Sequence, residues 1–227
     1  MSEIPFRVRH QSIPPVDGRE EAITNNLGSQ IVTDFYTQLW LSGVTYHMQT
    51  GTEDAPIITN GPMDDTKPII LADNSSGFMM PLRASVQLGA HSTSTAIAAM
   101  LEVDMDKARY TSGGTVYVPE QLNGAATSGP AANGVFYTIE GSDIVAAAKT
   151  AVPASVEVIR QTLSEDAIGD PAGGSLGGLP ALYDVRRDGP LGMVTPGSIL
   201  VHFGSATADV TGYGQLQFAQ FATGLAW

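Results

Sequence analysis

An acidic row in the middle of the chain is the arrangement of residues best suited to chemistry. Glu102, Asp104 and Asp106 alternate with apolar residues in the stretch AIAAMLEVDMD. Side chains spaced two residues apart share one face of a strand and lie roughly 7 Å from each other. Such carboxylates repel one another unless water, a basic side chain or a hard cation such as Ca²⁺ compensates their charge. We expect a solvated strand face. The alternatives are a salt-bridge patch between subunits, with Lys107, Arg109 or an arginine from a neighbouring copy, and a cation site.

The histidines offer a second kind of chemistry. The chain has four of them, none in the H-x-H or H-E-x-x-H spacing of metal sites: His10, His47, His91 and His202. In a cupin-like metal enzyme, His47, His202 and one of the acids would meet as ligands. We expect instead that each is an ordinary hydrogen-bonded strand histidine, and we assign no metal ligand.

Nucleophilic catalysis has little support in the sequence. There is no cysteine, which excludes thiolate chemistry and disulfides. GGSLG at 173–177 matches the bare G-x-S-x-G pattern, but the nucleophile elbow needs a strand before it and a helix after it, whereas DPA precedes and GLP follows. We therefore predict that the chain is not an enzyme and carries no cofactor.

The charge distribution limits the partners. The formal net charge is −12 with only three lysines, so the chain lacks the basic surface that strong nucleic-acid binding requires. Residues 1–19 are locally basic, through Arg7, Arg9 and Arg19 against Glu3 and Asp17. We expect these arginines to act in an assembly arm that reaches an acidic partner, including a neighbouring copy of the same chain.

The positions of proline residues predict a simple organisation of the chain. Pro5, Pro14 and Pro15 forbid regular helix near the start, so residues 1–29 are predicted to be an N-terminal arm and 30–227 a single domain. The first residues lack the apolar core of a signal peptide, and the longest apolar run, AIAAML, is far too short to span a membrane. We expect a protein made in the cytoplasm, not exported, with no membrane span.

Alternating apolar and polar residues predict an all-β chain of about eight to ten short strands. Strands are expected in QIVTDFYTQLW (30–40), VTYHMQT (44–50), GVFYTIEG (134–141) and ASVEVIRQTL (154–163). Hairpins are expected over 78–106 and over 196–221. One short helix is expected at SDIVAAAKTA (142–151), where Ser142 can cap an alanine-rich segment. Together these elements favour an antiparallel two-sheet sandwich.

The second arm of the last expected hairpin carries a row of amides. Gln215, Gln217 and Gln220 occur there among Tyr213, Leu216, Phe218 and Phe221. Amides do not titrate at physiological pH but hydrogen-bond well, which favours contact over catalysis. We therefore regard Gln215 and Gln217, together with Trp40 and Trp227, as candidate interface residues.

Two stretches carry a resemblance to a known family. After a proline-bearing arm, YTSGGTVYVPEQLNG and the closing PGSILVHFGS…GYGQLQFAQF resemble parts of the jelly-roll structural proteins of virions, especially capsid shell and capsid-decorating proteins of bacterial or archaeal viruses. The resemblance covers about 30–227. It implies a jelly roll that assembles with copies of itself, as a trimer or a larger array, and with other capsid proteins in the virion. It transfers no catalytic residues, and the arm is less basic than that of shell proteins that touch a packaged genome.

One further alternative is a carbohydrate- or receptor-binding β-sandwich module. Such a module needs an exposed aromatic platform, for which the candidates are Tyr36, Trp40, Tyr46 and Tyr117.

Overall fold

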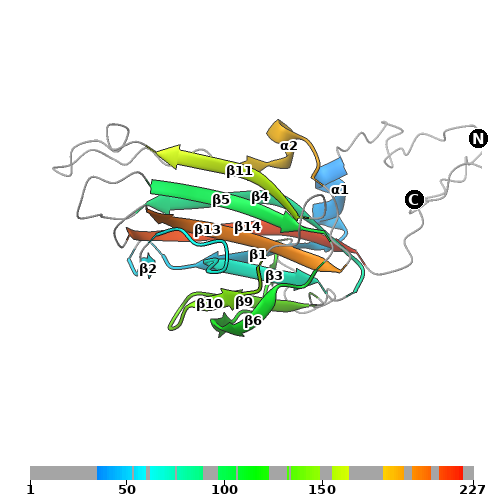
Figure 1. The fold of residues 1–227 in the computed structure, drawn as a ribbon. Coiled ribbons are helices and arrows are strands. Elements are labelled where there is room, and N and C mark those ends of the chain that lie inside the picture. The colour runs from blue at the N-terminus through cyan, green and yellow to red at the C-terminus, as the bar shows by residue number, and fades with distance from the viewer. Residues whose placement is uncertain are drawn as a thin grey trace, which may run out of the picture.

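The computed structural model describes residues 35–52, 54–59, 62–74, 76–88, 97–105, 107–122, 132, 134–148, 155–163, 181–191, 196–205 and 210–221. Most of these residues lie in two antiparallel sheets packed face to face (Figure 1). The predicted all-β sandwich is confirmed at this level. The arm at 1–29, with its three arginines, lies outside the described residues, as do Asp106 and Trp227.

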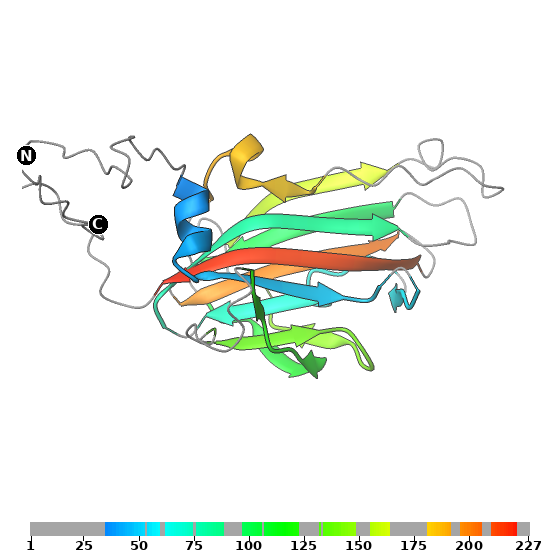
Figure 2. The ribbon, with the colours of Figure 1, turned by 180° about the vertical axis from the view of Figure 1, so that it is seen from behind.

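Sheet 1 contains the long C-terminal strand. Its order is β12-β4-β14-β1-β8, and β2 also pairs with β14. The strands are β1 (Thr45–Thr50), β2 (Ile57–Thr59), β4 (Phe78–Leu88), β8 (Glu120–Gln121), β12 (Tyr183–Asp184) and β14 (Val210–Phe221). Figure 2 shows this sheet with β14 in red at its centre.

Sheet 2 lies behind it, in the order β11-β5-β13-β3-β9-β7. Its strands are β3 (Ile70–Asn74), β5 (Ile97–Asp104), β7 (Thr115–Val116), β9 (Val135–Thr138), β11 (Ser155–Leu163) and β13 (Gly197–Ser205). Every residue of β3 and β13 is buried. Because alternation places half of these side chains on the outer face, something must cover that face as well.

The cover is a two-stranded ribbon made of β6 (Tyr110–Gly113) and β10 (Ile144–Ala146). Ile144 and Ala146 pack on Leu71 and Leu200 of sheet 2, forming a small second core. The rings of Tyr110 in β6 and Tyr137 in β9 stack with centroids 3.8 Å apart. The ribbon is thus a third layer on the outer face of sheet 2.

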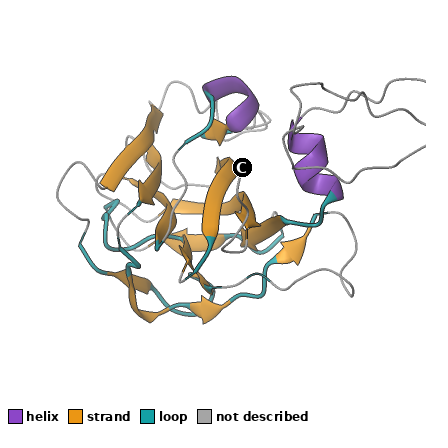
Figure 3. Cartoon of the chain, turned by 90° about the vertical axis from the view of Figure 1, so that its right-hand side faces the viewer, coloured by secondary structure: helices purple, strands orange, loops and turns teal. Residues whose placement is uncertain are grey.

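Two short helices complete the described structure. They are α1 (Phe35–Leu41) and α2 (Val185–Asp188), and Figure 3 shows both toward the upper right of the molecule. Asp184 caps α2 by accepting a hydrogen bond from the backbone N–H of Arg186. Both helices border the outer face of sheet 1, where they frame the groove described below.

The main core fills the space between the two sheets. Inward residues of both sheets contribute to it, among them Met48, Leu101, Val201 and Phe218. The Phe218 ring stacks at 5.6 Å from that of Phe136, which ties the centre of sheet 1 to sheet 2. Apolar burial between the sheets is therefore continuous from one to the other.

The two predicted hairpins are wrong. β4 pairs with β14 and β12, whereas β5 pairs with β11 and β13 in the other sheet. Likewise β13 and β14, although consecutive in the chain, belong to different sheets. In each case both strands carry an apolar face, and these faces pack against each other across the sandwich instead of the strands pairing edge to edge.

Two predicted elements have the wrong type. The segment predicted as a helix over 142–151 contains strand β10, because Ile144 and Ala146 alternate inward onto sheet 2 and override the helical preference of the alanines. In 30–40, the described part is helix α1 and not a strand. Its helical spacing of four residues places Tyr36 and Trp40 at the same groove.

Strands predicted around 44–50, 134–141 and 154–163 are confirmed. Neither described helix has the length and apolar character needed to cross a bilayer.

Close approach of the neighbouring strand β4 and of the opposite sheet makes Gly212 a sensitive position. A Cβ there would lie 2.5 Å from the carbonyl oxygen of Gln87 and 2.9 Å from the Phe203 ring. We expect Gly212→Ala to lower the free energy of unfolding by about 1–3 kcal/mol, since both the β4 backbone and the Phe203 ring must shift to admit the methyl group. Urea unfolding measures this. Gln215→Ala, on the half-buried outer face of the same strand, serves as the control, with an expected change within about 0.5 kcal/mol. Equal effects of the two substitutions would contradict the packing argument.

Candidate functional site

The acidic row is buried. Glu102 and Asp104 are 1% and 0% exposed, so the expectation of a solvated face is wrong for both. The predicted alternation with apolar neighbours is confirmed, because Leu101 and Val103 face the main core. The opposite face, however, lies under the ribbon and the chain that leads into it. Glu102 therefore needs a partner within the protein.

Arg109 is that partner. It is fully buried, and its Nη1 donates a hydrogen bond to Oε1 of Glu102 in an ion pair. Its Nε donates to the carbonyl oxygen of Ala147 at 2.8 Å, and its Nη2 to that of Asp65 at 2.9 Å. One guanidinium group thus joins strand β5, the end of the ribbon and the loop before β3. Within the described residues, the acidic row forms its salt bridge with an arginine of the same chain and not with one of a neighbouring copy.

A second carboxylate holds the backbone at the same place. The backbone N–H of Arg109 donates to Oδ1 of Asp73 at 3.2 Å and to Oγ of Ser198 at 2.8 Å, and that of Tyr110 donates to Oδ2 of Asp73 at 2.8 Å. The Ser198 hydroxyl also donates to Asp73. Burial raises the pKa of Asp73 above its usual value, while the hydrogen bonds from Ser198, Tyr110 and Arg109 act in the opposite direction.

His202 completes this cluster. It is fully buried on the same face of sheet 2, with Nδ1 3.2 Å from the carbonyl oxygen of Asp64 and Nε2 3.5 Å from Oε2 of Glu102. We call Asp73, Glu102, Arg109, Ser198 and His202 the buried polar cluster. Its acidic and basic side chains are at most 5% exposed, so a substrate has no access to them. The cluster is built to hold layers together.

The histidine pair required by a cupin-like metal site does not form. His202 faces the ribbon, whereas His47 lies on the outer face of sheet 1, since its neighbours Tyr46 and Met48 point into the core. Both sheets separate the two rings. Among the described residues, no group of three or more His, Asp or Glu side chains is placed to hold a metal ion. Burial lowers the pKa of His47 below its usual value, and the charge of Glu120 opposes this effect.

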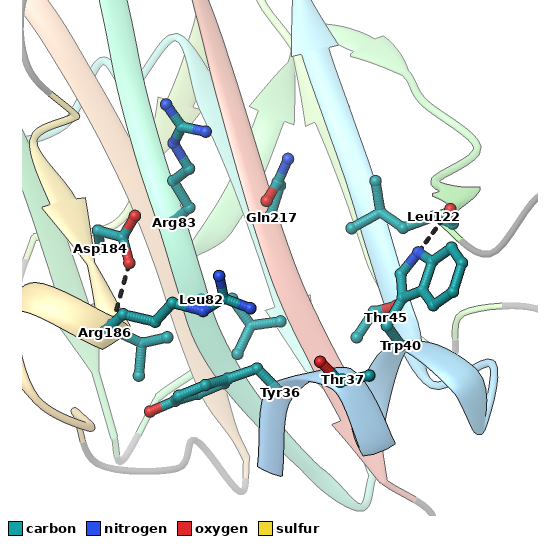
Figure 4. Close-up of a pocket in the computed structure, with 11 residues that line it drawn as sticks. Tyr36, Thr37, Trp40, Thr45, Leu82, Arg83, Leu122, Asp184, Arg186 and Gln217 are labelled. Carbon is teal, nitrogen blue, oxygen red and sulfur yellow. Dashed lines mark hydrogen bonds between the residues drawn. The ribbon is translucent and has the colours of Figure 1, made fainter. Parts of the chain in front are cut away.

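An accessible groove of about 330 Å³ lies on the outer face of sheet 1, between α1 and α2 (Figure 4). Strands β4, β14 and β1 form its floor. We call it the sheet 1 groove. Its lining residues are Tyr36, Thr37, Trp40, Thr45, Leu82, Arg83, Leu122, Asp184, Val185, Arg186 and Gln217.

Helix α1 supplies one aromatic side chain toward each side of the groove. Trp40 is 44% exposed, and its Nε1 donates to the carbonyl oxygen of Leu122 at 2.9 Å, which fixes the orientation of the indole. The Tyr36 ring extends toward α2, where the guanidinium carbon of Arg186 lies 5.6 Å from its centroid (Figure 4). This distance is within the range of a cation–π contact.

A polar row crosses the floor of the groove and continues beyond it. Arg83 of β4 is directly opposite Gln217 of β14, which is directly opposite His47 of β1, which is directly opposite Glu120 of β8. Within the described part of the chain, the Arg83 guanidinium and the Gln217 amide make no hydrogen bond or ion pair. Both groups are therefore available to a ligand.

The structure divides the predicted amide row. Gln215 and Gln217 are half-buried on the outer face of sheet 1, whereas Gln220 points inward and its Nε2 donates to Oδ1 of Asn74 at 3.1 Å. Of the four aromatic candidates, Tyr36 and Trp40 share the groove, while Tyr46 is buried in the core and Tyr117 packs against it. Sequence reasoning missed Arg83 and Arg186, since nothing local marks two arginines a hundred residues apart as neighbours.

No family model, curated protein or solved structure matches this chain.

The buried ion pair should dominate the stability of the ribbon. We expect Arg109→Met to lower the free energy of unfolding by about 3–5 kcal/mol, because it leaves the Glu102 carboxylate buried without its partner. Arg109→Met combined with Glu102→Met should recover most of this loss, since no uncompensated charge then remains. Urea unfolding of both single variants and the double variant measures the coupling. Additive losses in the double variant would contradict the assignment of a paired charge.

The raised pKa of Asp73 predicts a pH dependence. Because the folded-state pKa lies above the unfolded-state value of about 3.9, the group's contribution to stability is fully present below that pH and is lost as pH rises through the folded-state pKa. The free energy of unfolding of the natural protein, relative to that of Asp73→Asn, should therefore fall with rising pH. Urea titrations at several pH values measure this difference. A difference that grows with pH would show that the hydrogen bonds outweigh the burial.

Proposed function

We propose that this chain is a virion structural protein, a jelly-roll subunit that forms or decorates a capsid by self-association. The observation that carries the proposal is the order in which its strands pair. Eight strands in chain order pair first with last: β1 with β14, β3 with β13, β4 with β12, and β5 with β11.

This nested pairing is that of one long hairpin rolled into two sheets. The four pairs alternate between the sheets, giving the orders β12-β4-β14-β1 and β11-β5-β13-β3. That arrangement is typical of a jelly roll, the architecture of viral capsid and lectin domains and of cupins. The fold alone does not choose among these functions.

The filled interior favours assembly over cupin-like chemistry. The space between the sheets holds a continuous apolar core, and the inward Gln220 is hydrogen-bonded to Asn74. A ligand site between the sheets would need open, polar space there. The described chemistry lies instead on the outer faces, where subunits and ligands make contact.

An exposed apolar edge supports self-association. Among the described residues, four of the six large exposed apolar side chains lie on or beside strands β7, β9 and β10: Val116, Val118, Val135 and Val145. Val116 and Val118 are 69% and 80% exposed at β7, the last strand of sheet 2. Edge strands and exposed apolar residues are places where another chain can pair or pack.

The opposite edge of sheet 2 also lacks a neighbour within the described residues. It is formed by β11, nine residues long, which pairs only with β5. A strand of this length presents a row of backbone groups to which a segment of another copy can add. The arginines Arg7, Arg9 and Arg19 give residues 1–29 positive side chains for such a contact on a chain of net charge −12.

The first test is the particle mass of the purified full chain, by size-exclusion chromatography with light scattering and negative-stain imaging of the same peak. We expect trimers or larger regular assemblies whose formation is concentration-dependent. A clean monomer across the accessible concentration range would overturn the proposal.

Removal of residues 1–29 separates folding from assembly. The truncated chain should retain the β-rich circular dichroism and cooperative unfolding of the full chain but lose the larger particles. The full-length variant Arg7→Gln/Arg9→Gln/Arg19→Gln is the matched control for charge alone. Native-sized particles from the truncated chain would exclude a role for the arm.

A further inference from the structure

We propose that the sheet 1 groove binds a carboxylate-bearing sugar within an acidic glycan. This inference goes beyond self-association, because it concerns a ligand site within one subunit. It rests on four side chains that the fold brings together from distant parts of the chain: two arginines, an amide and a fixed indole ring.

The arginines make the groove unusual in an acidic chain. Arg83 and Arg186 lie on the side of the groove formed by β4 and α2, against the single carboxylate of Asp184 (Figure 4). Oδ1 of Asp184 is already an acceptor for the backbone N–H of Arg186. The formal charge of the lining is therefore positive, whereas that of the whole chain is −12. An anionic ligand would be favoured here over the rest of the molecule.

A carboxylate is the anion that this geometry suits. Guanidinium groups bind carboxylates through two parallel hydrogen bonds, and such pairs are stronger than neutral hydrogen bonds. Arg186 is held over the Tyr36 ring, which limits the conformational freedom that it would lose on binding. Arg83 is exposed and has no partner of its own within the described residues.

The other side of the groove suits a sugar ring. Trp40 lies across from the arginines, its indole fixed by the hydrogen bond to Leu122 and 44% exposed (Figure 4). The flat apolar surface of an indole packs against the C–H face of a pyranose. Between the arginines and Trp40, the Gln217 amide offers both a hydrogen-bond donor and an acceptor, as the hydroxyl groups of a sugar require.

This combination favours a glycan over an acidic peptide. An acidic peptide would use the arginines and, through its backbone, the amide, but its aspartate and glutamate side chains present no flat apolar face to the indole. The groove, at about 330 Å³, has room for a small ligand, which fits one or two sugar rings of a longer chain.

The experiment is isothermal titration calorimetry of the full-length protein with trigalacturonate. Arg83→Gln should weaken binding by about tenfold, the loss expected of one charged hydrogen bond, and Arg83→Gln/Arg186→Gln should abolish it. Trp40→Ala should also weaken binding. Lys67→Gln is the matched control: it removes one positive charge from a side chain that does not line the groove and should leave the affinity within about twofold.

Two further ligands make the outcome decisive. The methyl ester of trigalacturonate should bind at least about tenfold more weakly, because it keeps the sugar rings but removes the charge. Equal affinity for the ester would overturn the role of the carboxylate. Equal or tighter binding of hexaglutamate would overturn the sugar assignment in favour of acidic peptides, and no binding of trigalacturonate would overturn the proposal. Particle mass is measured separately, so failure here leaves the proposed self-association untouched.

Discussion

The buried guanidinium of Arg109 is the interaction on which the layering of this protein depends. It enters the interior on the chain that leads from β5 into the ribbon, and its partners lie on three other segments: Glu102, the carbonyl of Ala147 and the carbonyl of Asp65. Its own backbone N–H is held by Asp73 and Ser198. An unpaired buried charge strongly destabilises a fold. The ribbon therefore cannot separate from sheet 2 without breaking the ion pair between Arg109 and Glu102.

This constraint makes the two outer faces of the sandwich different. Sheet 2 is covered by the ribbon, so β3 and β13 are buried on both faces although they belong to an antiparallel sheet. Sheet 1 keeps a half-buried outer face with Gln215 and Gln217 on β14 and a groove beside its helices. Sheet 1 therefore offers an accessible face, while the central strands β3 and β13 of sheet 2 offer none, and sheet 2 presents its edges at β7 and β11.

The sequence allowed strands and their faces to be predicted, but not their partners. Alternation around Glu102 correctly separates an apolar face from an acidic one, yet the same pattern is compatible with water, with a cation or with an arginine above it. Similarly, β13 and β14 each show clear alternation, but a pattern of period two does not say whether consecutive strands pair or face each other across a core. The helix predicted over 142–151 failed for a related reason: tertiary burial of Ile144 outweighs local preference.

The groove was still less predictable, because its parts come from five separate segments between Tyr36 and Gln217. What distinguishes Arg83 from Arg109 is whether the described part of the chain supplies the carboxylate. Arg109 has Glu102 within the fold, and the pair is sealed from solvent. Arg83 projects from an equally regular strand, yet it has an amide opposite it on β14 and no acid paired with it in the described structure. An arginine such as Arg109 holds two layers together because its carboxylate partner belongs to the fold. Arg83 has no such partner in the described structure, and we propose that a ligand supplies the carboxylate.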